Sequence, residues 1–351
     1  NSIFINYMFI AIGSSPSSGS TFLSDLLDST DVTAVAPELN LFGLKQLYNI
    51  KQFKKNAYHC KSSSVFKTTH HLMTDFLYQW GLDKKRYEQM VFNSNSTISF
   101  LNSLKDHYLS LRGKNLNSVL FEKSPININA IKKYLNYYDQ YFIHIVRNPI
   151  YSFMSYKKRD ISIDLALVSW LVDQAIVFEF LNHPKLILIK YEDLVKNPYK
   201  ITSDIILKIS GKFISQKKIK NKFLKNNYRK LHITRIKTWS SKKSNIIHDG
   251  NKKIITDEDI KSLNLLWRLK VGKTYAKSFK ISNVSFQKIC KKLGYFDDIS
   301  KYIKKDIYEK KFRFSKKTKL QFFRKWMIDY RYRRTSFNEV NAYLNPIEFI
   351  K

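Results

Sequence analysis

The sequence predicts an α/β fold in three layers, with a central parallel sheet flanked by helices. Apolar segments at residues 9–12, 141–146 and 186–190 have the short, near-continuous character of buried strands. Segments with helical spacing of apolar residues lie between them, and this alternation is typical of a parallel sheet covered on both faces. At 351 residues and 44% hydrophobic, the chain is long enough to bury a large core.

The first strand leads through a loop of small residues, Gly13-Ser-Ser-Pro-Ser-Ser-Gly-Ser-Thr21, into an amphipathic helix. Small side chains let successive backbone N–H groups converge on an anion at the positive end of that helix. The loop therefore predicts a phosphate site, with a plain Ser/Gly turn as the alternative. It differs from the nucleotide-triphosphate loop, because five residues separate its glycines and Ser20 stands where that loop has Lys.

A second strand is expected at residues 31–36, and it ends at Pro37-Glu38. A carboxylate just beyond a parallel strand and near the first loop is well placed for general-base work. The alternative for Glu38 is a charge that stabilises a helix N-terminus after Pro37. Residues 44–116 are expected to form mixed helical segments on the substrate side.

A third strand within residues 117–125 brings Glu122 and Lys123 to its carboxyl end, where ligands of open α/β sheets gather. The strand at 141–146 ends at Arg147, and Pro149 is suited to the first turn of the next helix. Arg147 and Ser155, two turns along that helix, could then close on one phosphate.

Further helices are expected at residues 128–138 and 170–180. The strand at 186–190 is closed by Tyr191-Glu-Asp-Leu194, and Asn197-Pro198 begins another helix. These segments complete the alternation on which the fold class depends.

The formal net charge is +34, from 62 Lys and Arg against 28 Asp and Glu. Such an excess favours polyanionic partners, but Lys is abundant almost everywhere, so a residue-usage bias on a solvated surface is the competing explanation. Cys60 and Cys290 are too few and too far apart for a metal site or a disulfide framework, so no metal is expected. A reducing compartment is the default, with one long-range disulfide left open.

We expect two regions, a domain at residues 1–295 and a basic, aromatic-rich helical extension at 296–351. In Lys301 to Arg334 the aromatics recur among basic residues. A helical extension that packs these aromatics on the domain competes with an arm that contacts a membrane surface or nucleic acid. No apolar run approaches the roughly 20 residues that span a bilayer. The chain begins with Asn1 and not Met, which leaves an upstream segment open.

Three separated pieces together resemble the sulfotransferases that use 3′-phosphoadenosine 5′-phosphosulfate (PAPS). They are the loop Gly13 to Thr21, Glu122-Lys-Ser-Pro125, and Ile145-Val-Arg-Asn-Pro149 with Ser155. Tyr191-Glu-Asp-Leu194 with Asn197-Pro198 is similar to another recurrent element of that family. The resemblance covers roughly residues 8–200, with a weaker match to about 290, and implies a fold similar to that of P-loop nucleotide hydrolases. The branch that it resembles includes bacterial members and the tyrosylprotein sulfotransferases.

The resemblance also implies roles for individual residues. The phosphosulfate would be held by the loop residues, and the 3′-phosphate by an Arg and a Ser eight positions later. A further Arg and the segment Gly250-Asn-Lys-Lys253, before a Trp-containing helix, complete the nucleotide site. The predicted nucleotide-binding residues are Ser17, Ser18, Gly19, Ser20, Thr21, Arg147, Ser155, Arg159, Tyr191, Lys252 and Lys253. In the tyrosylprotein-like branch a Glu after the second strand is the base and a Lys of the middle strand stabilises the leaving bridge oxygen, and Glu38 and Lys123 match those positions.

One position departs from the family pattern. The loop usually carries Lys or Arg immediately before its last Ser-Gly or Thr-Gly pair, and here that position is Ser17. Either Lys123 takes over the duty of the missing cation or catalysis is weak, because losing such a contact typically costs a few kcal/mol in the transition state.

We therefore expect a PAPS-dependent sulfotransferase that sulfates a hydroxyl or amine of a glycan, lipid, peptide or small molecule, without a metal. A P-loop kinase and a non-catalytic polyanion-binding protein are the alternatives. The basic surface would suit an acidic glycan, lipopolysaccharide or acidic peptide as acceptor, but the residue-usage bias explains the charge nearly as well, so the acceptor stays open. No nucleic-acid partner is expected, and the location is expected to be cytoplasmic, with membrane-surface contact through the C-terminal segment left open.

Overall fold

The computed structural model describes residues 8–57, 77–157, 163–225, 256–303, 319–320 and 346–349. The chain divides into two compact units. The first takes its described residues from Asn1–Ser14, Gly19–Val146 and Pro184–His248. The second takes them from Ser15–Ser18, Arg147–His183 and Asp249–Lys351. The predicted boundary after residue 295 stays a prediction.

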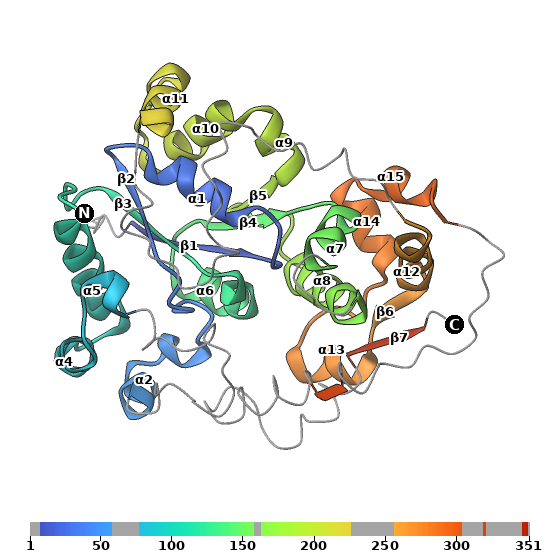
Figure 1. Cartoon of the computed structure of the whole chain (residues 1–351). Coiled ribbons are helices and arrows are strands. Elements are labelled where there is room, and N and C mark those ends of the chain that lie inside the picture. Colours follow the sequence, from blue (N-terminus) through green and yellow to red (C-terminus); the bar gives the residue numbers. More distant parts are fainter. Residues whose placement is uncertain are drawn as a thin grey trace. The chain divides into compact units, whose positions relative to one another are not determined.

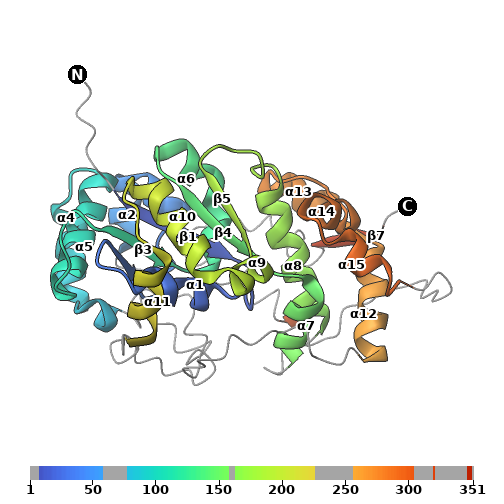
Figure 2. The ribbon, with the colours of Figure 1, turned by 90° about the horizontal axis from the view of Figure 1, so that it is seen from above.

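A five-stranded parallel sheet forms the centre of the first unit, and its strand order is β2-β3-β1-β4-β5. The strands run side by side in both ribbon views (Figures 1 and 2). Their bounds are β1 Phe9–Ser14, β2 Thr33–Ala36, β3 Val119–Lys123, β4 Phe142–Val146 and β5 Leu186–Lys190. All five strands were expected from the sequence, and the predicted α/β class is confirmed.

Helices connect these strands and cover both faces of the sheet. The α-helices among the described residues of this unit are α1 Ser20–Asp28, α2 Ile50–Ala57, α4 Lys84–Asn93, α5 Thr97–Leu111, α6 Ile131–Tyr137, α9 Tyr191–Lys196, α10 Pro198–Ser210 and α11 Gln216–Lys225. Short 3₁₀ helices lie at η1 Lys45–Tyr48, η3 Leu77–Trp80 and η4 Pro125–Ala130. The helix expected over 128–138 is therefore split between η4 and α6.

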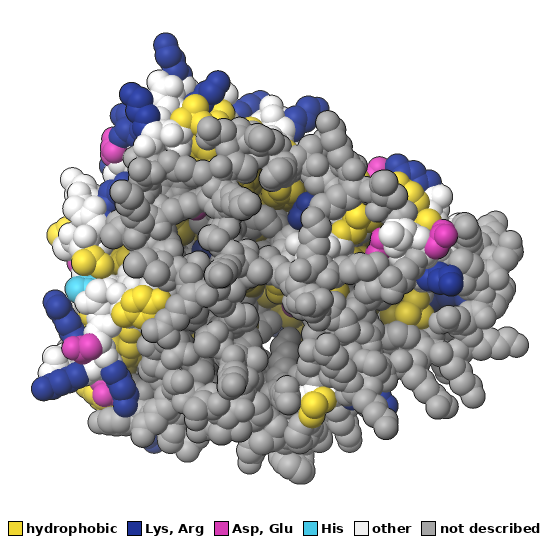
Figure 3. Space-filling model, viewed as in Figure 1, with side chains coloured by type: hydrophobic (Ala, Val, Ile, Leu, Met, Phe, Trp, Pro, Cys, Tyr) yellow, Lys and Arg dark blue, Asp and Glu magenta, His cyan; other side chains and the backbone are white. Residues whose placement is uncertain are grey.

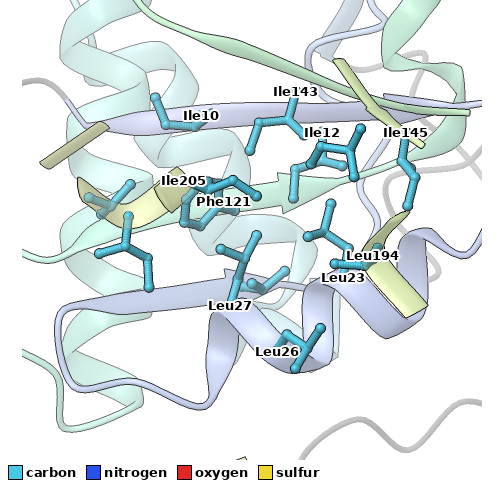
Figure 4. Packing of buried hydrophobic residues seen from close by; sticks show 14 of the residues in the cluster. Ile10, Ile12, Leu23, Leu26, Leu27, Phe121, Ile143, Ile145, Leu194 and Ile205 are labelled. Atoms are coloured by element: carbon cyan, nitrogen blue, oxygen red, sulfur yellow. The ribbon is translucent and has the colours of Figure 1, made fainter. Parts of the chain in front are cut away.

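Alternate residues of β1 enter different cores, because successive side chains of a strand point to opposite faces. Ile10 and Ile12 pack with Leu23 and Leu27 of α1 on one face (Figure 4). On the other face the ring of Phe9 meets that of Phe42 edge to face, with 5.1 Å between centroids. Each fully buried Leu or Ile contributes roughly 1.5–3 kcal/mol, so α1 is held firmly against the sheet.

The second unit is mainly helical. Its elements are α7 Pro149–Lys157, α8 Ile163–Phe178, α12 Asp257–Trp267, β6 Leu269–Val271, α13 Lys273–Phe279, α14 Phe286–Leu293, α15 Phe296–Ser300 and β7 Ile347–Phe349. Trp170 of α8 and Trp267 of α12 both contact Phe286, with ring centroids 5.3 and 6.3 Å apart. These aromatic contacts join three helices in one core.

The end of the chain differs from the helical extension expected there. Ile347–Phe349 forms β7, which pairs antiparallel with β6, and Lys270 forms an ion pair with Glu348 at 3.1 Å. The open edge of β6 offers backbone hydrogen bonds that a helix at this point could not use. Most of the expected extension lies outside the described residues.

Three further features of the described residues concern membrane-spanning helices, metal-binding clusters and groups of basic side chains. Their helices include none with the length and apolar character needed to cross a membrane. Within the same residues, no three His, Cys, Asp or Glu side chains come together as a metal ion would require. On the face drawn in Figure 3, basic side chains of the described residues lie in separate groups, one over α10 and α11 and another over α4.

Candidate functional site

The strand order marks one edge of the sheet as the place for a ligand. β1 lies between β3 and β4, and Ser14 is in register with Ile145. The chain leaves β1 toward β2 on one side and later returns through β4 on the other, which makes this a topological switch point. The loop that follows β1 and Arg147, which follows β4, are therefore candidates for ligand contacts.

The loop after β1 has an unusual backbone. Ser17 has a φ of 66° and Gly19 a φ of 87°, so both lie in the left-handed region. That region is uncommon for Ser, and strained backbone of this kind is concentrated at functional sites. Residues near left-handed positions can turn successive N–H groups toward one anion, at the positive end of α1.

Only glycine fits at position 19. A Cβ there would lie 2.1 Å from Cδ2 of Tyr191, which means that the Tyr191 ring packs against the loop backbone. Tyr191 is the first residue of α9 and directly follows β5. The structure thus brings together two of the predicted nucleotide-binding residues, Gly19 and Tyr191.

Three serine hydroxyls of this segment have unmet hydrogen-bonding capacity. The Oγ atoms of Ser14, Ser17 and Ser18 are buried and have no hydrogen-bond partner among the described residues. A buried polar group without a partner costs roughly 1–3 kcal/mol, so three in five residues form an unfavourable cluster. A bound anion would accept hydrogen bonds from such hydroxyls, so the loop is a candidate anion site.

Helix α8 braces the loop and Arg147. Gln174 Nε2 donates to Ser15 Oγ at 2.8 Å, and Trp170 Nε1 donates to the Arg147 carbonyl at 3.1 Å. Arg147 Nη1 donates in turn to the Ser17 carbonyl at 3.3 Å. Sequence reasoning missed Trp170 and Gln174, although their spacing of four residues places both on one face of a helix.

Glu38 and Lys123 form an ion pair. Glu38 follows β2, and Lys123 is the last residue of the neighbouring strand β3. Lys123 Nζ donates to Glu38 Oε1, and the two side chains are 13% and 12% exposed. The pair is thus mostly withdrawn from water. The structure brings the carboxylate of Glu38 and the ammonium group of Lys123, the two predicted catalytic residues, into direct contact.

Glu122, the residue before Lys123 in the sequence, is fully buried. It points to the opposite face of the sheet from Lys123, as neighbouring strand residues do. Burial, the largest effect, raises its pKa from 4.5 to about 7, while hydrogen bonds from Ser124, Asn127 and Leu39 act in the lowering direction. The sequence placed Glu122 at the strand end but did not reveal these bonds.

The remaining predicted residues are less informative. Ser20 and Thr21 open α1, where Ser20 is buried and Thr21 is half-buried, and Ser155 is half-buried on α7. Arg159, Lys252 and Lys253 lie outside the described residues. Their assignments stay predictions.

Comparison with known proteins finds one family model and several solved structures that are similar to the chain. The sequence model described as "Sulfotransferase family" matches residues 10–209. Among solved structures, the sulfotransferase domain of the Synechococcus PCC 7002 olefin synthase is 19% identical, covering 61% of this chain and 76% of that one, with a TM-score of 0.42. The sulfotransferase domain from the curacin biosynthetic pathway gives 19%, 60%, 75% and 0.42 for the same quantities. The sulfotransferase from Alicyclobacillus acidocaldarius gives 14%, 59%, 83% and 0.37. No curated protein matches the chain.

Proposed function

The chain belongs to the sulfotransferase family, and we propose that it transfers a sulfuryl group from PAPS to a hydroxyl or amine of an acceptor. The family match covers more than half of the chain and carries the reaction class. The observation that carries the donor is the segment from the end of β1 through the following loop, where the buried hydroxyls of Ser14, Ser17 and Ser18 have no hydrogen-bond partner among the described residues.

The loop residues would hold the 5′-phosphosulfate of the donor. Backbone N–H groups of Ser18 to Thr21 lie at the N-terminal end of α1, whose dipole favours negative charge. The hydroxyls of Ser17 and Ser18 would add donors at the same place. Gln174 and Tyr191 keep this loop in its conformation by their contacts with Ser15 and Gly19.

Arg147 and Ser155 would select the nucleotide through its 3′-phosphate. A guanidinium offers several N–H donors in a fixed plane and offsets much of the charge of a phosphate dianion. Arg147 is 8% exposed, so its charge is shielded less by water than that of a surface residue. Trp170, which binds the Arg147 carbonyl, fixes the backbone that carries this guanidinium.

Glu38 would act as the general base and Lys123 as the electrostatic partner of the leaving group. A neutral hydroxyl is a poor nucleophile, and Glu38 would take its proton during in-line attack. Lys123 would stabilise negative charge on the departing phosphate oxygen, the role that the cation before Ser18 has in most of the family. The bound donor supplies the sulfuryl group that is transferred. The ion pair between these residues keeps both side chains ordered before the acceptor arrives.

The acceptor class is open to direct measurement. Candidate glycans, lipids, peptides and phenols would be incubated with PAPS labelled with ³⁵S, and products would be separated and identified by mass spectrometry. We expect label in at least one acceptor and release of 3′-phosphoadenosine 5′-phosphate (PAP). Absence of transfer to every acceptor, together with no PAP binding by calorimetry, would contradict the proposal.

A thermal-shift experiment separates this function from its alternatives. PAP is expected to raise the unfolding temperature in the absence of Mg²⁺, because it presents both phosphates to the predicted site. Stabilisation by ATP with Mg²⁺ but not by PAP would indicate a kinase. Polyanion binding that survives Arg147→Ala and weakens steeply with salt would indicate a non-catalytic binding protein.

A further inference from the structure

The segment that carries Glu38 is held by a buried hydrogen-bond network on the other face of β3. Glu122 Oε1 accepts the Leu39 N–H at 2.8 Å, and Leu39 directly follows Glu38. Ser124 Oγ accepts the Asn40 N–H at 2.9 Å and itself donates to Glu122 Oε1. Two consecutive peptide groups after Glu38 thus end on one carboxylate, one of them through a hydroxyl.

Asn127 completes this network and extends it to β1. Its Nδ2 donates to Glu122 Oε2 at 2.7 Å and to the Ile12 carbonyl at 3.1 Å. Its Oδ1 accepts the Gly43 N–H at 3.0 Å. The residues Glu122, Ser124 and Asn127, here called the clamp, are all 0% exposed.

The clamped segment contains backbone that needs such support. Asn40 has a φ of 57°, in the left-handed region, where Asn is among the few residues other than Gly to occur. A Cβ at Gly43 would lie 2.7 Å from the Ile126 carbonyl oxygen, so the segment lies directly on the backbone of η4. Left-handed backbone persists where surrounding bonds over-determine it, and the clamp supplies those bonds.

From these contacts we infer that the clamp is a positioning device for the sulfuryl-transfer step, in which Glu122 fixes Glu38 beside Lys123. This inference rests on the proposed function for its catalytic part and on the contacts alone for its structural part. Glu122 touches neither donor nor acceptor in this role, so it is a positioning residue and Glu38 is the catalytic one.

The substitution Glu122→Gln tests the hydrogen bonds of the clamp without changing the size of the side chain. Above its pKa of about 7 the Glu122 carboxylate is ionised, and it then accepts from three donors, which are Leu39 N–H, Ser124 O–H and Asn127 Nδ2. A Gln side chain has one oxygen and one NH₂ group, so in either orientation its NH₂ meets at least one of these donors. Glu122→Gln therefore keeps the side-chain volume and breaks one connection of the clamp.

The test compares Glu122→Gln with Glu88→Gln, the same substitution at an ion pair on α4. We expect Glu122→Gln to lower kcat for labelled sulfuryl transfer by about 30- to 100-fold, because misplacement of about 1 Å can have that effect. KM for PAPS and PAP binding are expected to stay within about threefold, and Glu88→Gln to leave all three unchanged. A purely structural role would lower folded protein rather than kcat per folded molecule.

A double variant asks whether Glu122 acts through Glu38. Glu38→Gln with Glu122→Gln is expected to be no slower than Glu38→Gln alone, because residues that act as a unit are not additive. Independent, additive losses would overturn the inference, and so would an unchanged kcat in Glu122→Gln. Should Glu122→Gln fail to fold, Ser124→Ala removes the acceptor of the Asn40 N–H and is expected to lower kcat about tenfold.

Amide hydrogen exchange tests the structural part without any activity. The Leu39 and Asn40 amides are expected to exchange at least tenfold faster in Glu122→Gln, while those of β4 keep their rates. Unchanged exchange at Leu39 and Asn40 overturns the clamp, even if the wild-type protein is an active sulfotransferase. Faster exchange together with a wild-type protein that neither binds PAP nor transfers sulfate contradicts the proposed function, and with it the catalytic part of the inference.

Discussion

Substitution of Lys123 gives the most direct test of the proposed chemistry. The loop has Ser17 where most of the family has a cation, and Lys123 is the side chain that we assign to the missing charge. Lys123→Ala removes this cation and leaves Glu38 without its ion-pair partner. Both effects act on the chemical step more than on binding of the nucleotide.

The expected fall in kcat follows from the burial of the Lys123–Glu38 ion pair. One preorganised electrostatic contact to a developing oxyanion is worth roughly 10²- to 10³-fold in kcat, or about 2.7–4 kcal/mol. Lys123 is 13% exposed, so screening by water reduces that value only in part. We expect kcat to fall at least 10²-fold in Lys123→Ala, with PAP affinity changed less than threefold.

The assay is steady-state transfer from labelled PAPS, with PAP binding measured by calorimetry on the same preparations. Lys132→Ala, at an exposed lysine of α6, is the matched control and is expected to keep full activity. Ser17→Lys in the Lys123→Ala background restores a cation at the family position and is expected to recover part of the lost kcat. A kcat for Lys123→Ala within threefold of the wild type would refute the assignment.

Three further predictions test other parts of the site. Glu38→Gln should lower kcat by roughly 10²- to 10⁴-fold and leave PAP binding intact, as for loss of a general base, and an active variant would move the base elsewhere. Gly19→Ala should lower PAP affinity at least tenfold, because its Cβ would lie 2.1 Å from the Tyr191 ring, whereas Gly211→Ala, with a φ of 68° but open space, should affect stability alone. Burial raises the pKa of Glu122 from 4.5 to about 7, so the folded state holds the proton of this carboxyl more tightly than the unfolded state does. The resulting contribution to the free energy of unfolding is fully present below pH 4.5 and is lost as the pH rises through 7. Denaturant unfolding should therefore show Glu122→Gln gaining on the wild type by at most roughly 3 kcal/mol between pH 4.5 and 8, and a constant difference would contradict the raised pKa.

Much of the fold could be predicted because each strand carries its own signal. β1, β4 and β5 are short apolar runs, and buried parallel strands need that composition whatever their neighbours are. The loop after β1 is equally local, since its small residues are adjacent in the sequence. β7 was not expected, because a three-residue strand exists only through its pairing with β6, which lies far away in the sequence.

The clamp shows why the rest of the site could not be predicted. Glu122 and Lys123 are adjacent in the sequence, and the alternation of a strand already sends them to opposite faces. Which of the two reaches Glu38 depends on the path of residues 37–43 across the end of β3, and that path is set by tertiary contacts with Ser124 and Asn127. No local pattern encodes it.

The side chain and the backbone of Ser17 affect the site in different ways. As a side chain it lacks the charge that most of the family places there, and we assign the role of that missing cation to Lys123. As backbone it holds a left-handed conformation and accepts a hydrogen bond from Arg147 through its carbonyl. The loop can thus keep its anion-binding shape without the usual cation. We therefore expect binding and catalysis to be separable in this chain, so that the Lys123 variants weaken the second and leave the first.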